Sequence, residues 1–381
     1  MRGRDFRVDR RCTRVWAGLL ATLLSTWSLP AAALDLSDDV HLFGFYSLQA
    51  DLLDNDALNL PRSRVQLDEG QPNVESSLLG VQADYAASER LSFKLQGVVG
   101  GQVAADYQPA LEWVYLSYDL GQDLFLRGGK FQIPFLQGTE LRRVGFSRLW
   151  VRPLVPNSGA GGFDDYRGAE LLKRATVGDY NLTFQAGVGE SEHERDRVRN
   201  GRIALLSGRI ERNESWLKLA LLEARFDIYD RTGRQLGNNL DKLSVSIETE
   251  QLYRRWVVNA GYVFGDADLS PRDQLAYLSF GYRAERLTPY LLYQYQSMEF
   301  DGAEIPGPPP PPRPGIRPPP PPKDGRLEVN SLSLGVRYDL GPAYAIKAQW
   351  EHQKLRDDSS QVTGIIEEHG NIFSLVFEGV F

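Results

Sequence analysis

Apolar and polar residues alternate along most of the chain after residue 33. Successive side chains of a β-strand point to opposite faces, so this alternation predicts strands with one apolar and one polar face. A ten-residue strand tilted by about 45° rises about 24 Å, the height of the lipid-facing band of a membrane β-barrel. Sixteen segments are predicted to be strands: 40–52, 76–85, 91–99, 111–120, 124–131, 167–176, 180–189, 202–211, 215–226, 240–250, 255–265, 274–283, 287–298, 327–340, 343–355 and 371–381.

The predicted connections alternate in length. Seven short turns alternate with eight longer connections. Short turns at one rim and long loops at the other are typical of an outer-membrane β-barrel, whereas a soluble β-sandwich gives no reason for them. We therefore predict an all-β fold, a transmembrane antiparallel barrel of about sixteen strands with a water-filled lumen. The longer connections lie near 53–75, 101–109, 132–166, 190–201, 227–239, 266–273, 299–326 and 356–370.

The last predicted strand, 371–381, ends on an aromatic residue with no polar tail. We predict that it pairs with the first strand, 40–52, because this pairing would close the barrel and leave no unpaired sheet edge. The large residues of its apolar face are Phe373, Leu375, Phe377 and Phe381.

The first 33 residues have the pattern of a secretory signal. A region with six arginines precedes an apolar run over 15–29, and three alanines at 31–33 supply the small residues of a cleavage site. A membrane-spanning helix is the alternative, but about 15 apolar residues fall short of the roughly 20 that cross a bilayer. We therefore expect residues 1–33 to be a signal peptide and residues 34–381 to form the barrel.

The composition of residues 34–381 excludes several classes of function. They include 37 basic and 48 acidic residues, a net charge of −11, which disfavours a nucleic-acid binder. The single cysteine, Cys12, lies in the predicted signal, so no thiol nucleophile remains. An outer-membrane hydrolase is the rival class, but the four histidines lie in separate segments and no hydrolase motif is present. We predict no enzymatic activity, no catalytic residue, no cofactor and no metal site.

The connection over 132–166 is the longest and is too apolar for a free surface loop. We predict that it folds into the lumen, where its apolar side packs on the wall and its charges narrow the pore. A cap over the mouth and a contact between subunits are the alternatives. Its charged residues are Arg142, Arg143, Arg148, Arg152, Glu140, Asp164 and Asp165.

The connection over 299–326 contains a proline-rich run. Residues 306–322 hold 12 of the 22 prolines. Proline donates no backbone hydrogen bond, so this run is expected to form an extended polyproline II arm outside the cell. It is either a stiff surface insertion or an arm that binds a partner.

Several stretches resemble Gram-negative outer-membrane porins of the general-diffusion and phosphate-selective groups. These are GGKFQIPF at 128–135, VGFSRLWVRP at 144–153 and YRGAELL at 166–172, with the sixteen strands and the terminal Phe381. The resemblance implies a homotrimer in the bacterial outer membrane, in contact with its lipid and lipopolysaccharide, whose third loop is the constriction. It also implies that the terminal aromatic strand is read by the barrel-assembly machinery, although Gly379 stands where a larger apolar residue is usual.

A porin performs no bond chemistry, and it selects small solutes and ions by pore size and by the charges at its constriction. Several arginines in a narrow throat would concentrate anions, so we expect a mild anion preference. A salt bridge from each arginine to a wall carboxylate is the alternative. A channel specific for phosphate or another anionic nutrient and a non-conducting adhesin that uses the proline-rich arm are further alternatives. Wall cations expected to face the lumen are Lys94, Arg127, Arg174, Lys218, Arg337 and Lys347.

Overall fold

A computed structural model describes most of the chain after residue 33. The predicted signal peptide, nearly all of the proline-rich connection and parts of the connection over 132–166 lie outside the described residues. The described residues are 34–54, 70–101, 107–136, 141, 143–152, 154, 165–193, 198–229, 235–268, 272–300, 325–358 and 366–381.

These residues form seventeen strands and one short 3-10 helix. Among them, no helix is long and apolar enough to cross a membrane. The elements are β1 (Leu34–Ser37), β2 (Val40–Leu53), β3 (Leu78–Ala86), β4 (Leu91–Gly100), β5 (Ala110–Gly121), β6 (Leu124–Gln132), η3 (Gly145–Ser147), β7 (Asp165–Val177), β8 (Tyr180–His193), β9 (Val198–Arg212), β10 (Ser215–Tyr229), β11 (Gln235–Tyr253), β12 (Trp256–Ala267), β13 (Arg272–Tyr282), β14 (Leu287–Phe300), β15 (Gly325–Asp339), β16 (Tyr344–Asp357) and β17 (Ile366–Val380).

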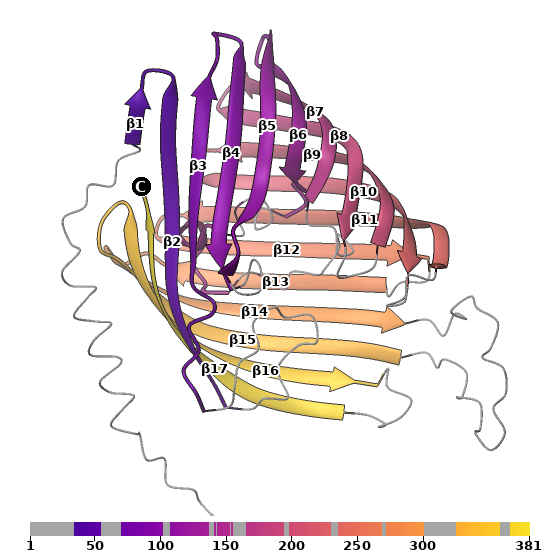
Figure 1. Ribbon diagram of the computed structural model, residues 1–381. Helices are drawn as coiled ribbons and strands as arrows, with labels where there is room; N and C mark the ends of the chain where they lie inside the picture. The colour runs from indigo at the N-terminus through magenta and orange to yellow at the C-terminus, as the bar shows by residue number, and fades with distance from the viewer. Residues whose placement is uncertain are drawn as a thin grey trace, which may run out of the picture.

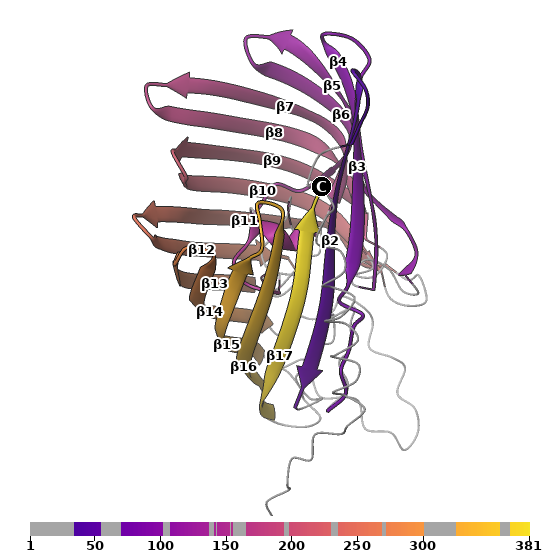
Figure 2. The same ribbon diagram turned by 90° about the vertical axis from the view of Figure 1, so that its left-hand side faces the viewer.

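Strands β2 to β17 form one closed antiparallel barrel. Each strand pairs with the next along the chain, and β17 pairs with β2, with Gly379 opposite Tyr46. Figures 1 and 2 show β17 running beside β2. Past the end of β17, the backbone N–H of Phe381 donates to Gly44 at 2.9 Å, and the Gly44 N–H donates back at 2.8 Å. The predicted fold class, the sixteen strands and the closure by the terminal strand are confirmed.

One strand outside the ring was not predicted. β1 pairs with the start of β2, where Asp35 lies opposite His41 and the two side chains are 2.5 Å apart. Four residues are too few for an alternating pattern to stand out from a loop.

The two faces of the barrel differ in exposure as the alternation predicts. On β2, Leu48 is 45% exposed, whereas Gln49 and Asp51 are buried. On β17, Phe373 is 51% exposed and its neighbour Ser374 is buried. The apolar face therefore points outward, where a membrane barrel meets lipid, and the polar face points inward.

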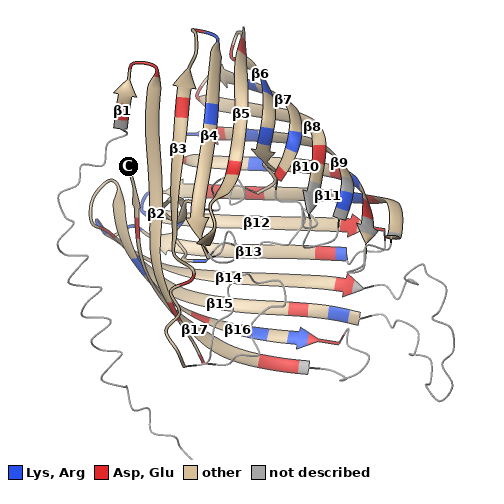
Figure 3. Ribbon diagram, in the orientation of Figure 1, with Lys and Arg blue, Asp and Glu red and all other residues tan. Residues whose placement is uncertain are grey.

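The strands extend further than the alternation indicates. Two-residue turns such as 122–123 and 213–214 join strands at one rim, where Asn213 has the left-handed φ of 54° that tight hairpins favour. Toward the other rim the ladders continue past the apolar band, so β11 spans 19 residues instead of the predicted 240–250. Figure 3 shows charged residues at the ends of β13, β14 and β15 next to the longer connections. Those charges interrupt the apolar pattern although the backbone pairing continues.

Candidate pore constriction

The segment between β6 and β7 begins against the inner face of the barrel. Ile133, Phe135 and Leu136 belong to one apolar cluster with residues of β9 to β13. The hydroxyl group of Ser246 on β11 donates to the carbonyl oxygen of Phe135 at 2.7 Å. The first apolar residues of the segment are therefore buried on the wall. Their wall partners are Ile203, Leu205, Ala220, Leu222, Ala224, Phe226, Leu240, Val263 and Leu275.

Residues 143–152 contact a different part of the inner face. Lys347 Nζ on β16 donates to the carbonyl oxygen of Gly145 at 2.8 Å. Arg337 Nη1 on β15 donates to the carbonyl oxygen of Phe146 at 2.6 Å. In both contacts a wall cation holds the backbone of the segment.

Aromatic residues extend this contact to β13 and β14. The ring of Trp150 lies edge-on to the ring of Tyr277, with 5.8 Å between the centroids. The N–H of Val151 donates to Gln349 Oε1 at 3.0 Å, and the hydroxyl group of Tyr290 donates to the same oxygen at 2.8 Å. The amide oxygen of Gln349 on β16 thus connects the segment to Tyr290 on β14.

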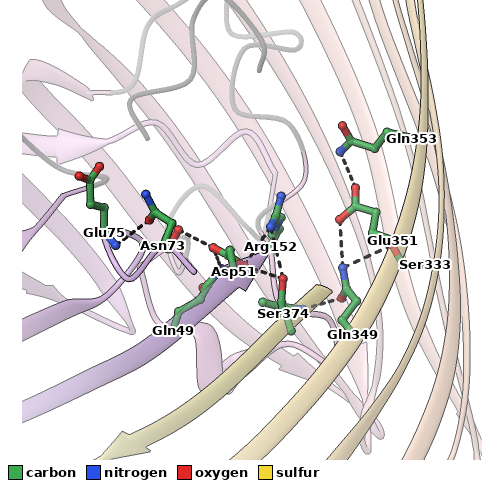
Figure 4. Close-up of polar contacts among 12 residues, drawn as sticks. Gln49, Asp51, Asn73, Glu75, Arg152, Ser333, Gln349, Glu351, Gln353 and Ser374 are labelled. Carbon is green, nitrogen blue, oxygen red and sulfur yellow. Dashed lines mark hydrogen bonds and ion pairs between the residues drawn. The ribbon is translucent and has the colours of Figure 1, made fainter. Parts of the chain in front are cut away.

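Arg152 joins a buried polar network on β2 and β17 (Figure 4). Its Nη2 lies 2.9 Å from Asp51 Oδ1. Asp51, which is 2% exposed, also accepts hydrogen bonds from the hydroxyl groups of Ser76 and Ser374 and from the amide of Gln49, at 2.6 to 3.0 Å. This carboxylate therefore ties the segment to the seam where the barrel closes.

The other described arginines of the segment also lie beside acids. Arg143 Nε is 3.1 Å from Glu112 Oε1, and Gln132 donates to the other oxygen of Glu112 at 2.7 Å. Burial lowers the pKa of the Arg148 guanidinium from its ordinary value, and the carboxylate of Glu378 opposes that shift. Arg143 and Arg152 are therefore in salt bridges with carboxylates, as the alternative to free pore-lining arginines expects.

The predicted wall cations have close partners as well. Lys94 pairs with Asp84, and Arg127 pairs with Glu170. The guanidinium of Arg174 lies 5.6 Å from the centre of a phenylalanine ring on β6. Lys347 pairs with Glu378 at 2.7 Å, with both side chains almost fully buried. Three of these cations are thus paired with acids on the inner face.

The structure does not bring Asp165 to the arginines of the segment. Asp165 begins β7 and pairs with Lys130 at 3.1 Å. The next residue, Tyr166, belongs to the inner apolar cluster, so the Asp165 side chain is on the opposite face. The other charges of the predicted constriction lie outside the described residues: Glu140, Arg142 and Asp164.

The acids that bind the arginines were not predicted as site residues. Alternation places Asp51 on the polar face of its strand, but it gives no partner for this carboxylate. Asp51 and Arg152 are separated by 101 residues along the chain. Contacts at that separation depend on the path of the connection, which strand periodicity does not describe.

No family model matches the chain, and a search of curated proteins finds no match. Solved structures do match. The anion-selective porin from Comamonas acidovorans has 13% identity and a TM-score of 0.59, covering 90% of this chain and 99% of that one. OprB of Pseudomonas putida has 10% identity and a TM-score of 0.58, covering 96% and 97%. In-vitro folded OmpT of Vibrio cholerae, in a trimer form, has 11% identity and a TM-score of 0.57, covering 90% and 99%.

The comparisons agree with the ring of strands described above. Identities of 10 to 13% show a shared fold, and the aligned regions include nearly all of each chain. The resemblance in fold to Gram-negative outer-membrane porins is confirmed. The chain has the closed sixteen-stranded β-barrel fold of these outer-membrane proteins.

Proposed function

We propose that residues 34–381 form a porin of the bacterial outer membrane, through which small hydrophilic solutes and ions diffuse passively. The observation that carries this proposal is the closed barrel with an apolar outer face and a polar inner face. An inner face of this kind can hold water across the membrane, so solutes pass without a chemical step. We propose no enzymatic role and no cofactor.

The segment between β6 and β7 is proposed to narrow this lumen. Its described residues bind inward-facing side chains on strands from both sides of the closing seam, which supports a position inside the barrel. Arg142, Arg143, Arg148 and Arg152 are assigned to the constriction. Because Arg143 and Arg152 are paired with acids, the local surplus of positive charge is small. The proposed anion preference is therefore mild.

The test of this proposal is a planar-bilayer recording of the purified protein in a KCl gradient. We expect stepwise conductance increases and a reversal potential on the anion side. Folded protein without any conductance would overturn the porin proposal and favour the adhesin alternative, which depends on the proline-rich arm. A cation-side reversal potential would keep the channel and refute the anion preference.

Contacts with outer-membrane lipid are proposed at the rim of the longer connections. Ion pairs on the outward face include Arg272 with Glu299 at 3.8 Å and Arg326 with Glu328 at 3.0 Å. Charged side chains at this height suit the headgroups of lipid and lipopolysaccharide, because the apolar band of the barrel ends there.

The assembly partners are proposed from the terminal strand and the barrel surface. Phe373, Leu375, Phe377 and Phe381 are assigned as the signal that the barrel-assembly machinery reads. Phe373 and Phe381 are exposed on the outward face, where a partner can reach them. A homotrimer is proposed as the assembled form, and three equal conductance steps per insertion would support it. No nucleic acid is expected as a partner.

A further inference from the structure

A cavity of about 520 Å³ lies inside the barrel beside strands β2 to β5. Pro342 and Ala343, in the turn between β15 and β16, also line it, which places it toward the rim of short turns. Val144 of the segment between β6 and β7 closes another side. A cavity of this size is within the usual range for a small-molecule site.

Four side chains form a single row across its wall. Phe43 on β2 lies opposite Gln82 on β3, Gln82 lies opposite Gln96 on β4, and Gln96 lies opposite Trp113 on β5. All four line the cavity. Neighbouring strands are about 4.8 Å apart, so the row spans about 14 Å. Two amides are thus flanked by two aromatic side chains.

This row has donors and acceptors that are not fully used in hydrogen bonds among the described residues. Trp113 Nε1 is buried and has no hydrogen-bond partner. The bond from Gln96 Nε2 to Gln82 Oε1 is long, at 3.5 Å, so a ligand could replace it. An indole N–H only donates, whereas an amide both donates and accepts. A ligand with several hydroxyl groups could satisfy these groups together.

The charge beside the row is neutralised within the protein. Asp84 pairs with Lys94 and accepts a hydrogen bond from Gln82 Nε2 at 2.8 Å. The cavity therefore gives a small ion little net attraction. Recognition at this place depends on ring faces and on neutral hydrogen bonds.

We infer that this cavity is a subsite for a neutral polyhydroxylated ring, that is, a mono- or disaccharide. The C–H face of a pyranose packs on an aromatic side chain while its hydroxyl groups bond with amides and the indole N–H. A row of about 14 Å accommodates one or two such rings. The inference rests on the proposed channel function. It names a class of solute that would bind transiently at this cavity during its passage through the channel.

The experiment is the block of single-channel KCl current by glucose and maltose, with sorbitol as the open-chain comparison. We expect both sugars to reduce the current at lower concentrations than sorbitol does, because sorbitol has no fixed apolar ring face. Trp113→Ala and Gln96→Ala should each raise the half-blocking concentration of maltose at least about threefold, the usual effect of one lost hydrogen bond. Gln185→Ala removes a similar amide from β8, away from the cavity, and should leave that concentration unchanged.

Folding of each variant is checked by its heat-modifiable migration in SDS gels, and Trp113→Phe keeps a ring if the alanine variant does not fold. Two outcomes with a normal KCl current would overturn the subsite and leave the channel proposal intact. One is equal block by sorbitol and glucose. The other is an unchanged half-blocking concentration of maltose in the folded Trp113 and Gln96 variants. Folded protein with no current would refute the channel. Equilibrium dialysis of the detergent-solubilised barrel with radiolabelled maltose then tests the subsite directly, and absence of binding that depends on Trp113 would overturn it.

Discussion

At the scale of single residues, the inner face is organised by pairs of opposite charge. Glu112 is 5% exposed and holds Arg143, so each charge partly cancels the field of the other. A change to one member therefore exposes the charge of its partner. Such a change alters the local charge by one unit, and ion selectivity should respond to it.

Arg143→Gln is expected to leave Glu112 uncompensated and to shift permeation toward cations. The expected change in the permeability ratio of anion to cation is roughly twofold, because the charge would act in the narrow polar throat of the proposed channel. Reversal potentials in a KCl gradient measure it. Glu112→Gln is the matched control and should shift the ratio toward anions. A shift in the same direction for both variants would contradict the pairing.

Gly379 stands in the terminal strand where a larger apolar residue is usual, and its neighbour on β2 gives the reason. A Cβ added at this position would lie 2.7 Å from ring atoms of Tyr46, the residue opposite on β2. The ring of Tyr46 therefore occupies the space that a larger residue at position 379 would need.

Gly379→Leu is expected to lower the fraction of folded barrel, since the displaced Tyr46 ring costs about 1–3 kcal/mol. Heat-modifiable migration after refolding in detergent measures this fraction. Combining Gly379→Leu with Tyr46→Ala should recover much of the loss, because the leucine then fills the vacated space. No recovery in the double variant would show that the two side chains do not compete.

At the scale of elements, the strands could be predicted from the sequence, while the contacts of the segment between β6 and β7 could not. The alternation of apolar and polar residues identified all sixteen barrel strands, because each strand has one face toward lipid and one toward the interior. The four-residue β1 carried too little pattern. The segment was recognised by its apolar residues and arginines. Its arginines pair with Asp51 and Glu112, and these partners could be identified only from the three-dimensional path of the chain.

The anchor of this segment on β16 and β17 gives a prediction at the same scale. Lys347 holds the carbonyl oxygen of Gly145 and the carboxylate of Glu378, and it is fully buried. Lys347→Met leaves that carboxylate buried beside fewer cations, which is expected to destabilise the barrel by about 3–5 kcal/mol. Urea titration in detergent measures the free energy of unfolding.

The double variant Lys347→Met, Glu378→Gln is the control for that experiment. It removes both charges, so its unfolding free energy should lie closer to that of the unchanged protein. Its open-channel current should still be noisier, because the hydrogen bond to Gly145 is missing. A double variant as unstable as the single one would argue against the buried pair as the cause.

At the scale of the whole molecule, stability depends on closing the ring. β17 supplies hydrogen bonds to β16 on one side and to β2 on the other. Without it, both neighbours would have unpaired edges, which favour aggregation. The closed form has no such edge between β2 and β17.

Deletion of residues 366–381 is therefore expected to abolish the SDS-resistant folded form and to give aggregated protein. Sedimentation and gel migration after refolding measure the outcome. Deletion of residues 34–37, which removes only β1 from outside the ring, is the matched control and should leave the folded form intact. Normal folding without residues 366–381 would show that closure is not required.

The barrel wall holds the segment between β6 and β7 through the backbone of the segment. This mode of attachment affects how the proposed pore can change its selectivity during evolution. Lys347, Arg337 and Ser246 all donate to backbone carbonyl oxygens of the segment, at Gly145, Phe146 and Phe135. Carbonyl oxygens are the same whichever side chain a residue carries. Many side chains of the segment can therefore be exchanged while these anchors remain. If this segment is the proposed constriction, a lineage that faces a new nutrient could change the selectivity of the channel by substitutions within one short stretch, while the surrounding barrel keeps its structure.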